Sequence, residues 1–379
     1  MKNILITGGA GFIGSKLSLS LVQKGYKVTV LDNLSPQIHG SDALNNSVLY
    51  LSIKDKVRFL LGSVNSRIDW EEAIFGQDAI VHLAAETGTG QSMYEIARYC
   101  DVNIGGTAIL LDILANQQHS IKKIVVASSR SIYGEGKYWS DELNKFVYPK
   151  HRSEEFMSKG DFDVKMIGCK EPLKLVATDE DSIIHPSSVY GITKQNQEQM
   201  IMTICPTIGI APVAFRYQNV YGPGQSLSNP YTGILSIFST LIRNGKEINI
   251  FEDGKESRDF VFIDDVVQAT ILGLEKDDAN GQIYNVGSGS TTDVLTVAEQ
   301  LILNYQIPAK INITGNFRLG DIRHNFADLE KIKTQLGYNP HYNFYTGIKL
   351  FCDWVKNQEI IESNFEESLD QMKSKGLLK

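Results

Sequence analysis

Cysteine is scarce in this sequence. The 379 residues include four cysteines, at positions 100, 169, 205 and 352, and no two of them form a C-x-x-C pair. This spacing excludes a disulfide scaffold and a zinc signature, and it is typical of a reducing compartment. Because the seven histidines are also scattered, we expect no metal site.

Long apolar runs and a leader segment are also missing. No stretch approaches the about eighteen consecutive apolar residues of a transmembrane helix, and the opening MKNILITGG lacks a basic region followed by an apolar core. Acidic residues outnumber basic ones, 44 to 37, for a formal net charge of −7, which argues against nucleic-acid and membrane-surface partners. The sequence predicts a cytoplasmic protein that binds neither.

The first half instead alternates short apolar runs with longer amphipathic segments. The runs are near-continuous, as in parallel strands covered on both faces. They lie at residues 3–7, 27–32, 57–62, 79–85 and 123–128, and a later strand is expected at 210–217. The segments with helical spacing lie at 12–25, 102–118 and 189–205. This order predicts an α/β fold with a Rossmann-type doubly wound parallel sheet.

Residues 135–186 interrupt the alternation. They are charged, poorly periodic and too long for an ordinary connection, so we expect an insertion, ordered by its aromatic residues. After residue 221 the elements become short and mixed. The predicted organisation is a dinucleotide-binding domain over 1–221, a smaller mixed α/β substrate lobe over 222–355, and a charged tail over 356–379 that forms a surface helix or a loose end.

A glycine-rich turn, TGGAGFIG, directly follows the first strand. Its glycines at 9, 11 and 14 satisfy G-x-G-x-x-G, and those at 8, 11 and 14 satisfy the G-x-x-G-x-x-G variant. Such a turn lets a pyrophosphate approach the backbone at the positive end of the next helix. Asp32 ends the second strand, where a ribose 2′-hydroxyl acceptor belongs, and no arginine lies within 33–37. Because Asp32 would repel a 2′-phosphate, the sequence predicts NAD rather than NADP.

Two further stretches contain reactive side chains. SSVYGITK, at 187–194, places Tyr190 and Lys194 four residues apart and so on one face of a predicted helix. Alone, this pair is also compatible with a surface tyrosine and lysine. SSRSIYG, at 128–134, ends a predicted strand with three serines and an arginine.

In combination these motifs resemble the extended short-chain dehydrogenase/reductase family, the NAD-dependent epimerases and dehydratases of nucleotide sugars. The resemblance covers about residues 1–330. It rests on TGGAGFIG, Asp32, HLAA (82–85), VNIGGT (102–107), SSRSIYG, YGITK, RYQNVYGPGQ (216–225), RDFVFIDDV (258–266) and YNVGSG (284–289), in the family's order. The NAD-binding residues that it implies are Gly8, Gly11, Phe12, Ile13, Gly14, Asp32, Asn33, Ser63, Val64, Leu83, Ala84, Ala85, Tyr190 and Lys194.

The resemblance also implies catalytic roles. Tyr190 is expected to remove a proton from a sugar hydroxyl that Ser129 hydrogen-bonds, while Lys194 favours the phenolate. A free tyrosine has a pKa of about 10, so it needs such help to act as a base near neutral pH. The family's sugar 4,6-dehydratases carry an Asp–Glu pair at the positions of Arg130 and Ser131, and neither residue here can replace it. The expectation is therefore C4 epimerisation through a transient 4-keto sugar, with NAD regenerated in each cycle.

Two stretches indicate a substrate class. HLAAETGTGQSMYE (82–95) and CKEPLKLVATDEDSIIHPSSVYGITKQNQEQM (169–200) resemble the nucleotide-linked 6-deoxyhexose 4-epimerases and imply a substrate like dTDP-L-rhamnose. Arginines suit bidentate phosphate binding, although Arg130, Arg258 and Arg323 could instead form ion pairs. Thr87 could instead cap a helix. The expected substrate-binding residues are Thr87, Ser129, Arg130, Ser131, Asn219, Arg258 and Arg323.

Several alternatives stay open at this point. Among enzymes they are another nucleotide-sugar epimerase, acting at C2 or at C4 of a UDP-hexose, and an NAD-dependent sugar dehydrogenase. Outside enzymes, a catalytically silent NAD-binding regulatory protein is possible, although the intact Ser129, Tyr190 and Lys194 argue against it. The resemblance further implies a homodimer formed through a four-helix bundle of residues 95–117 and 188–206.

Overall fold

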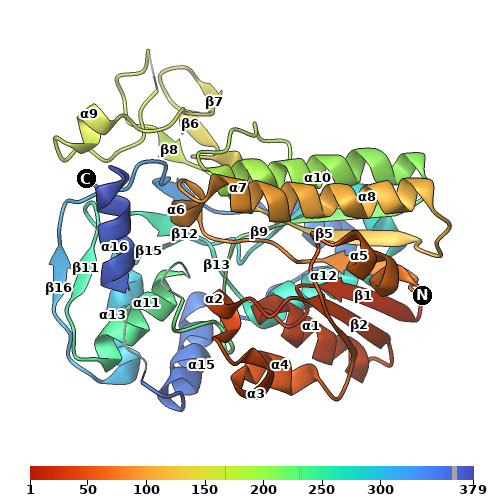
Figure 1. Cartoon of the computed structure of the whole chain (residues 1–379). Coiled ribbons are helices and arrows are strands. Elements are labelled where there is room, and N and C mark those ends of the chain that lie inside the picture. Colours follow the sequence, from red (N-terminus) through yellow and green to blue (C-terminus); the bar gives the residue numbers. More distant parts are fainter. Residues whose placement is uncertain (167, 230, 232, 361–364) are drawn as a thin grey trace.

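Seven parallel strands form one central sheet (Figure 1). The computed structural model describes residues 1–379 except 167, 230, 232 and 361–364. The strand order is β14-β9-β5-β4-β1-β2-β3, which confirms the predicted doubly wound sheet. The strands are β1 (Asn3–Thr7), β2 (Lys27–Asp32), β3 (Arg58–Leu61), β4 (Ala79–His82), β5 (Lys123–Ser129), β9 (Ala211–Tyr217) and β14 (Gln282–Val286).

The register of the strands aligns their carboxyl ends at one edge of the sheet. Thr7 of β1 pairs with Leu31 of β2 on one side and with His82 of β4 on the other. The strand order reverses between β1 and β4, and open α/β sheets bind ligands in the crevice at such a point. The strand predicted over residues 79–85 ends at His82. The next three residues leave the sheet at this crevice.

Helices cover both faces of the sheet, and each face has its own core. Leu5 and Val126 are buried with residues of α8 and α10, whereas Ile6 and Val125 are buried with residues of α1 and α12. This two-sided burial is the reason that the strands are continuously apolar. The helices are α5 (Arg67–Ile74), α8 (Gly106–Asn116) and α10 (Val189–Thr207) on one face, and α1 (Phe12–Gln23), α4 (Val48–Ile53) and α12 (Ile263–Glu275) on the other.

The helix predicted over 102–118 is divided. It begins as a π-helix, η1 (Cys100–Gly105), which follows α7 (Ile96–Tyr99) and continues into α8. The buried amide of Asn103 donates to the carbonyl oxygen of Glu86 and to Thr193 Oγ1, and its Oδ1 accepts from the N–H of Glu86. These bonds satisfy a buried polar group and hold the chain that leaves β4 against α10.

After residue 221 the chain builds a second lobe and also returns to the sheet. β14 pairs with β9 at the edge of the sheet, and α12 packs against α1. Two elements beyond 221 therefore complete the dinucleotide-binding half, and the division at this residue stays a proposal. The lobe and its connections contain β10 (Asn219–Tyr221), α11 (Ile234–Arg243), β11 (Ile248–Ile250), β12 (Ser257–Arg258), β13 (Phe260–Phe262), β15 (Thr292–Asp293), α13 (Val294–Tyr305), β16 (Ile311–Ile313), β17 (His324–Asn325), α14 (Glu330–Leu336) and α15 (Phe344–Lys356).

The insertion folds as a small antiparallel sheet, seen at the upper left of Figure 1. Its strands enclose Tyr138, Val147 and Val164, as expected of an ordered segment. Its elements are β6 (Tyr138–Ser140), β7 (Lys145–Val147), α9 (Glu154–Met157) and β8 (Lys174–Leu175). The other short helices of the chain are α2 (Pro36–His39), α3 (Ala43–Asn46), α6 (Thr89–Ser92), η2 (Arg130–Tyr133) and η3 (Asp277–Ala279).

The charged tail is docked rather than loose. Its helix α16 (Phe365–Ser374) buries Met372, and Leu378 beyond it is 5% exposed. The backbones of Lys379 and Phe317 exchange two hydrogen bonds of 3.0 Å. Within the described residues no helix has both the length and the apolar character needed to cross a membrane.

Candidate active site

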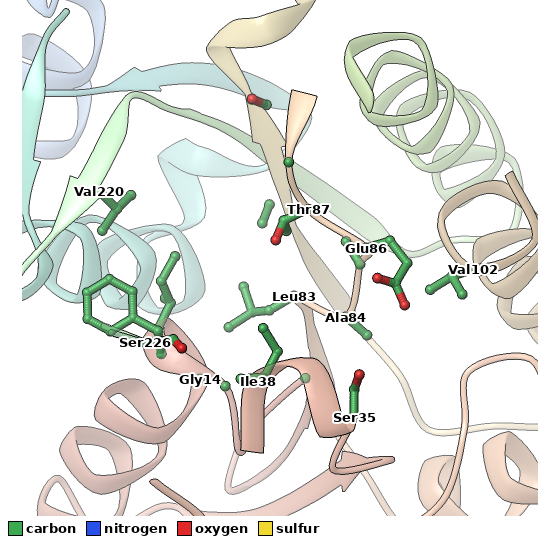
Figure 2. A pocket seen from close by; sticks show the side chains of 18 of the residues that line it. Gly14, Ser35, Ile38, Leu83, Ala84, Glu86, Thr87, Val102, Val220 and Ser226 are labelled. Atoms are coloured by element: carbon green, nitrogen blue, oxygen red, sulfur yellow. The ribbon is translucent and has the colours of Figure 1, made fainter. Parts of the chain in front are cut away.

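A cavity of about 460 Å³ opens at the carboxyl ends of β1, β2, β4 and β5. In Figure 2, Leu83, Ala84, Glu86 and Thr87 follow one another through the middle of this cavity as the chain leaves β4. All predicted site residues line it except Arg258 and Arg323. The fold therefore brings nineteen residues together, counting those of the predicted NAD set together with Thr87, Ser129, Arg130, Ser131 and Asn219.

The glycine turn forms a cradle that fits a pyrophosphate. Gly11 precedes α1, where no side chain caps the helix and no acidic residue occupies the first turn, so the positive helix end is open to an anion. A Cβ placed on Gly14 would lie 2.6 Å from Gly9 Cα and closer still to the carbonyl oxygen of Gly8. Only glycine allows this approach.

Substituting Gly14 by alanine is expected to remove bound NAD, because the added methyl group must push the turn away from the start of α1. The measurement is the NAD content of the purified protein, released by acid and quantified. The matched control is Gly105→Ala, at a helical backbone position (φ −61°) outside the cavity lining, where an added Cβ makes only ordinary contact, 3.8 Å from the carbonyl oxygen of Cys100. A Gly14→Ala protein that retains stoichiometric NAD would contradict this role of the turn.

Asp32 lies at the end of β2 beside the cradle. Its Oδ2 accepts the N–H of Ala10 and its Oδ1 accepts the N–H of Leu34, each at 2.9 Å. Burial raises the pKa of Asp32 above its ordinary value, while the Leu34 bond and the nearby His39 act in the opposite direction. The carboxylate is thus fixed at the wall of the cavity, as a ribose hydroxyl acceptor needs to be.

Tyr190 lies in the first turn of α10 and faces the end of β5. Ser188 Oγ caps the helix by accepting the N–H of Gly191 at 3.1 Å, and the N–H of Tyr190 donates to Ser92 Oγ at 3.0 Å. Burial raises the pKa of Tyr190, whereas a side-chain hydrogen bond with Ser129 and the charge of Arg130 lower it. The tyrosine and serine thus occupy the positions that a proton transfer from a bound hydroxyl requires.

Lys194 follows one helical turn later and is fully enclosed. Its Nζ donates to Gln197 Oε1 at 2.6 Å. Burial lowers the pKa of Lys194 to about 7, against the opposing effect of Glu198. Gln197 in turn donates to Thr107 Oγ1 at 2.9 Å. Lys194, Gln197 and Thr107 therefore form one chain of hydrogen bonds between buried side chains.

Arg130 and Ser131 begin η2 immediately after Ser129. Arg130 Nε donates to Asn219 Oδ1 at 2.6 Å, and Ser131 Oγ donates to Ser129 Oγ at 2.9 Å. No ion pair involves Arg130 in the described part of the chain, so the alternative of an ion pair with the insertion is not what the structure shows.

The two other arginines predicted to bind substrate lie outside the cavity lining. Arg258 donates to the carbonyl oxygens of Ser257, Ile322 and Arg323 at 2.7 to 2.9 Å. Arg323 is 1% exposed, and its guanidinium binds Asp253 at 2.6 and 2.8 Å and Glu252 at 3.0 Å. The prediction of Arg323 as a phosphate ligand is therefore not supported, because carboxylates of its own lobe bind both of its terminal nitrogens.

One wall of the cavity consists of residues that the sequence motifs did not indicate. This wall comes from the chain after β9, and part of it lay within the RYQNVYGPGQ motif without being assigned to a role. Tyr231 Oη donates to Gln371 Oε1 of α16 at 3.0 Å, so the tail borders the cavity at this side. The described residues of this wall that had no assigned role are Gln218, Val220, Gln225, Ser226, Asn229, Tyr231 and Gly233. Ser35, Gln37, Ile38 and His39 are among the other unassigned residues, across the cavity.

Metal-binding groups do not stand out in the structure. Among the residues described, no three or more His, Cys, Asp or Glu side chains are grouped so that they could hold a metal ion. His82, at the end of β4, is fully buried with hydrogen bonds to Thr7 and Thr107, and burial lowers its pKa to about 3. It is a neutral hydrogen-bonding residue of the core.

Sequence comparison places these features in a family. The NAD dependent epimerase/dehydratase family matches residues 4–154 and 165–287. The dTDP-L-rhamnose 4-epimerase of Burkholderia thailandensis is 36% identical and is aligned over 96% of this chain and 97% of its own. A putative UDP-glucose 4-epimerase of Methanocaldococcus jannaschii is 29% identical over 93% of this chain and 98% of its own.

Two solved structures of similar fold are epimerases with nucleotide sugars bound. The UDP-glucose 4-epimerase of Thermotoga maritima, solved with UDP-glucose, superposes with a TM-score of 0.74 at 29% identity, covering 93% of this chain and 98% of its own. The UDP-glucuronic acid 4-epimerase of Bacillus cereus, solved with its substrate and NAD, gives 0.74 at 25% identity over 93% and 99%. The cofactor of this protein is NAD, and the chain belongs to the NAD-dependent epimerase/dehydratase family, among its nucleotide-sugar epimerases.

Proposed function

We propose that this protein epimerises a nucleotide-linked 6-deoxyhexose at C4 and that dTDP-L-rhamnose is its substrate. The proposal rests above all on one cavity, in which a glycine cradle for NAD adjoins Ser129, Tyr190 and Lys194. Arg130 and Ser131 stand where a dehydratase would need an acid and a base. A 36% identical relative is named as an epimerase of dTDP-L-rhamnose, which supports this choice of sugar.

The lining of the cavity also argues against elimination of water. Its acidic side chains, among the residues described, are Asp32 and Glu86. Asp32 lies beside the glycine cradle, and Glu86 is paired with Arg98 at 2.6 Å. Because neither carboxyl adjoins Ser129, the described cavity lining offers no acidic pair to remove a proton from C5 and expel the C6 hydroxyl.

In the proposed reaction the C4–H and O4–H bonds of the sugar break in one step. NAD⁺, when bound, supplies the hydride acceptor and a positively charged ring beside the sugar. Ser129 Oγ hydrogen-bonds O4, and Tyr190 Oη takes its proton. The 4-keto sugar then turns over, hydride returns to the opposite face of C4, and Tyr190 returns the proton to O4. No atom or electron is gained or lost over the cycle.

The test is proton NMR of the purified protein with dTDP-L-rhamnose in heavy water, without added NAD. We expect the C4 epimer to appear without solvent deuterium on carbon, since hydride leaves and returns within one complex. Deuterium at C3 or C5 would instead indicate proton abstraction next to a ketone and would overturn C4 epimerisation by hydride transfer. Turnover of a UDP-hexose but not of dTDP-L-rhamnose would keep the reaction and overturn the proposed sugar. Net formation of NADH from added NAD would identify a dehydrogenase.

We further propose that the enzyme is a cytoplasmic homodimer. Helices α8 and α10 lie side by side on one face of the sheet (Figure 1), and pairing them with a second copy would form the four-helix bundle that the family resemblance implies. Ile192 of α10 is 45% exposed and Ile96 of α7 is 52% exposed, which suits such an interface. Light scattering of the wild type and of Ile192→Glu tests it, and a monomeric wild type would contradict it.

A further inference from the structure

We propose that Gln37, Gln91 and Arg98 form a clasp that closes over bound NAD and sets the rate at which the protein releases it. The inference goes beyond the proposed reaction, because it concerns retention of the cofactor and holds for whichever sugar is turned over. The clasp consists of side-chain hydrogen bonds between α2, which follows β2, and the helices α6 and α7, which follow β4.

The central part of the clasp is a reciprocal pair of amides. Gln37 Nε2 donates to Gln91 Oε1 at 3.0 Å, and Gln91 Nε2 donates to Gln37 Oε1 at 3.3 Å. Arg98 Nη2 donates to the same oxygen of Gln37 at 3.1 Å. Gln37 Nε2 also donates to Asn229 Oδ1 at 3.5 Å, on the cavity wall that follows β9. One side chain of α2 is thus joined to α6, to α7 and to the wall after β9.

The strand order places this clasp over the glycine turn. β1 lies between β4 and β2 in the sheet. The turn begins directly after β1, where the N–H of Gly8 donates to the carbonyl oxygen of Leu31 and the N–H of Leu83 donates to that of Thr7. A bond from the chain after β2 to the chain after β4 therefore crosses the carboxyl end of β1. Because a pyrophosphate belongs in the cradle at this end, the clasp spans the position of the cofactor.

The lining of the cavity agrees with this placement. Ser35, Gln37 and Ile38 line it from α2 and its cap, and Thr89 lines it from α6. In Figure 2, Ser35 and Ile38 lie below Leu83, the first residue after β4. The connections after β2 and β4 therefore enclose the same cavity from two sides, and the clasp joins them.

The half of the clasp that follows β4 is firmly anchored. Gln91 is 3% exposed, and its amide also donates to Glu95 Oε1 at 3.1 Å and accepts from Tyr99 Oη at 3.2 Å. Arg98 forms ion pairs with Glu86 at 2.6 Å and with Glu95 at 2.7 Å. These bonds hold the two donors to Gln37 in one arrangement.

The other half, α2, depends more on the clasp. It is four residues long and has no side-chain cap, and a helix of this length is not stable by itself. Its last residue, His39, bonds Ser47 of the same connection at 2.7 Å. Among the described residues, Gln37 thus provides the side-chain hydrogen bonds that join α2 to the chain after β4. We expect α2 to move when NAD leaves and these bonds to break.

The experiment is a double-mutant cycle on the NAD release rate of the holoenzyme. Protein that carries radiolabelled NAD is diluted into excess unlabelled NAD, and the label that stays on the protein is followed over time. Gln37→Met and Gln91→Met each remove the amide pair, so we expect each variant to release NAD about ten-fold faster than the wild type. The double variant should also be only about ten-fold faster, because its second substitution removes bonds already lost.

The control is Gln77→Met. Gln77 is 4% exposed, and its Nε2 donates to Thr29 Oγ1 of β2 at 3.1 Å. It precedes β4, at the amino end of that strand and outside the cavity lining, so its loss should leave NAD release at the wild-type rate. Faster release in this variant would show that general destabilisation frees the cofactor, and it would overturn the clasp.

Two further outcomes overturn the inference. Additive effects, about hundred-fold in the double variant, would identify Gln37 as a direct ligand of NAD, and an unchanged release rate in Gln91→Met would show that the amide pair does not retain the cofactor. If Gln91→Met fails to fold, Arg98→Met, at a side chain 36% exposed, takes its place with the same test of additivity. None of these measurements involves turnover, so a wrong sugar assignment leaves their result intact.

Discussion

Replacing Tyr190 by phenylalanine is expected to lower kcat for epimerisation by about 10²- to 10⁴-fold, the range for loss of a positioned acid–base group. The phenyl ring still fills the cavity wall, and the helix cap at Ser188 involves only the backbone of Gly191, so α10 should keep its structure. The measurement is the single-turnover rate with saturating nucleotide sugar, together with the NAD content of the protein.

The matched control is Tyr26→Phe. Tyr26 Oη donates to Glu275 Oε1 at 3.0 Å, and neither residue belongs to the cavity lining, so its loss should leave kcat on the order of the wild-type value. A Tyr190→Phe enzyme with near wild-type kcat would show that another group accepts the proton. Retained NAD with lost turnover would locate the defect in the chemical step rather than in cofactor binding.

Replacing Arg323 by methionine is expected to destabilise the protein by about 3 kcal/mol, the lower end of the range for breaking a buried ion pair. The substitution leaves Asp253 without its two hydrogen bonds from the guanidinium. Glu252 is less affected because Arg152 still binds both of its carboxylate oxygens at 2.7 Å, which is why the lower end applies. Urea unfolding of the holoenzyme measures the loss.

The control for this prediction is Lys310→Met. Lys310 and Glu247 form an exposed pair, with side chains 68% and 52% accessible, and such pairs contribute about 0–1 kcal/mol. A stable Arg323→Met protein with a sharply raised KM would contradict the structural role and would return Arg323 to the phosphate-binding set.

Local patterns in the sequence were enough to predict the sheet and most of the cavity. The glycine turn, Asp32 at the end of a strand, and Tyr190 four residues before Lys194 all depend on backbone geometry within one strand, turn or helix. Parallel strands then bring their carboxyl ends to one edge without further information. The family resemblance added the chemical roles, which spacing alone left open.

Only the tertiary structure determined which groups the long side chains contact. Arg258 and Arg323 were both predicted to face phosphate, but the first binds backbone carbonyls and the second binds acidic residues some seventy positions earlier. The charged terminal stretch likewise did not indicate how the tail docks, with Lys379 bound to the backbone of Phe317 and Gln371 of α16 bound to Tyr231.

Arg130 shows both sides of this division. The sequence determined that an arginine replaces an acid directly after Ser129. The tertiary structure alone determined that η2 lies against Gly191, that no carboxylate of the described residues forms an ion pair with the guanidinium, and that Tyr190 lines the same cavity. The reason is physical: a local pattern sets backbone direction, whereas the partner of a long charged side chain depends on which distant segments the fold packs beside it.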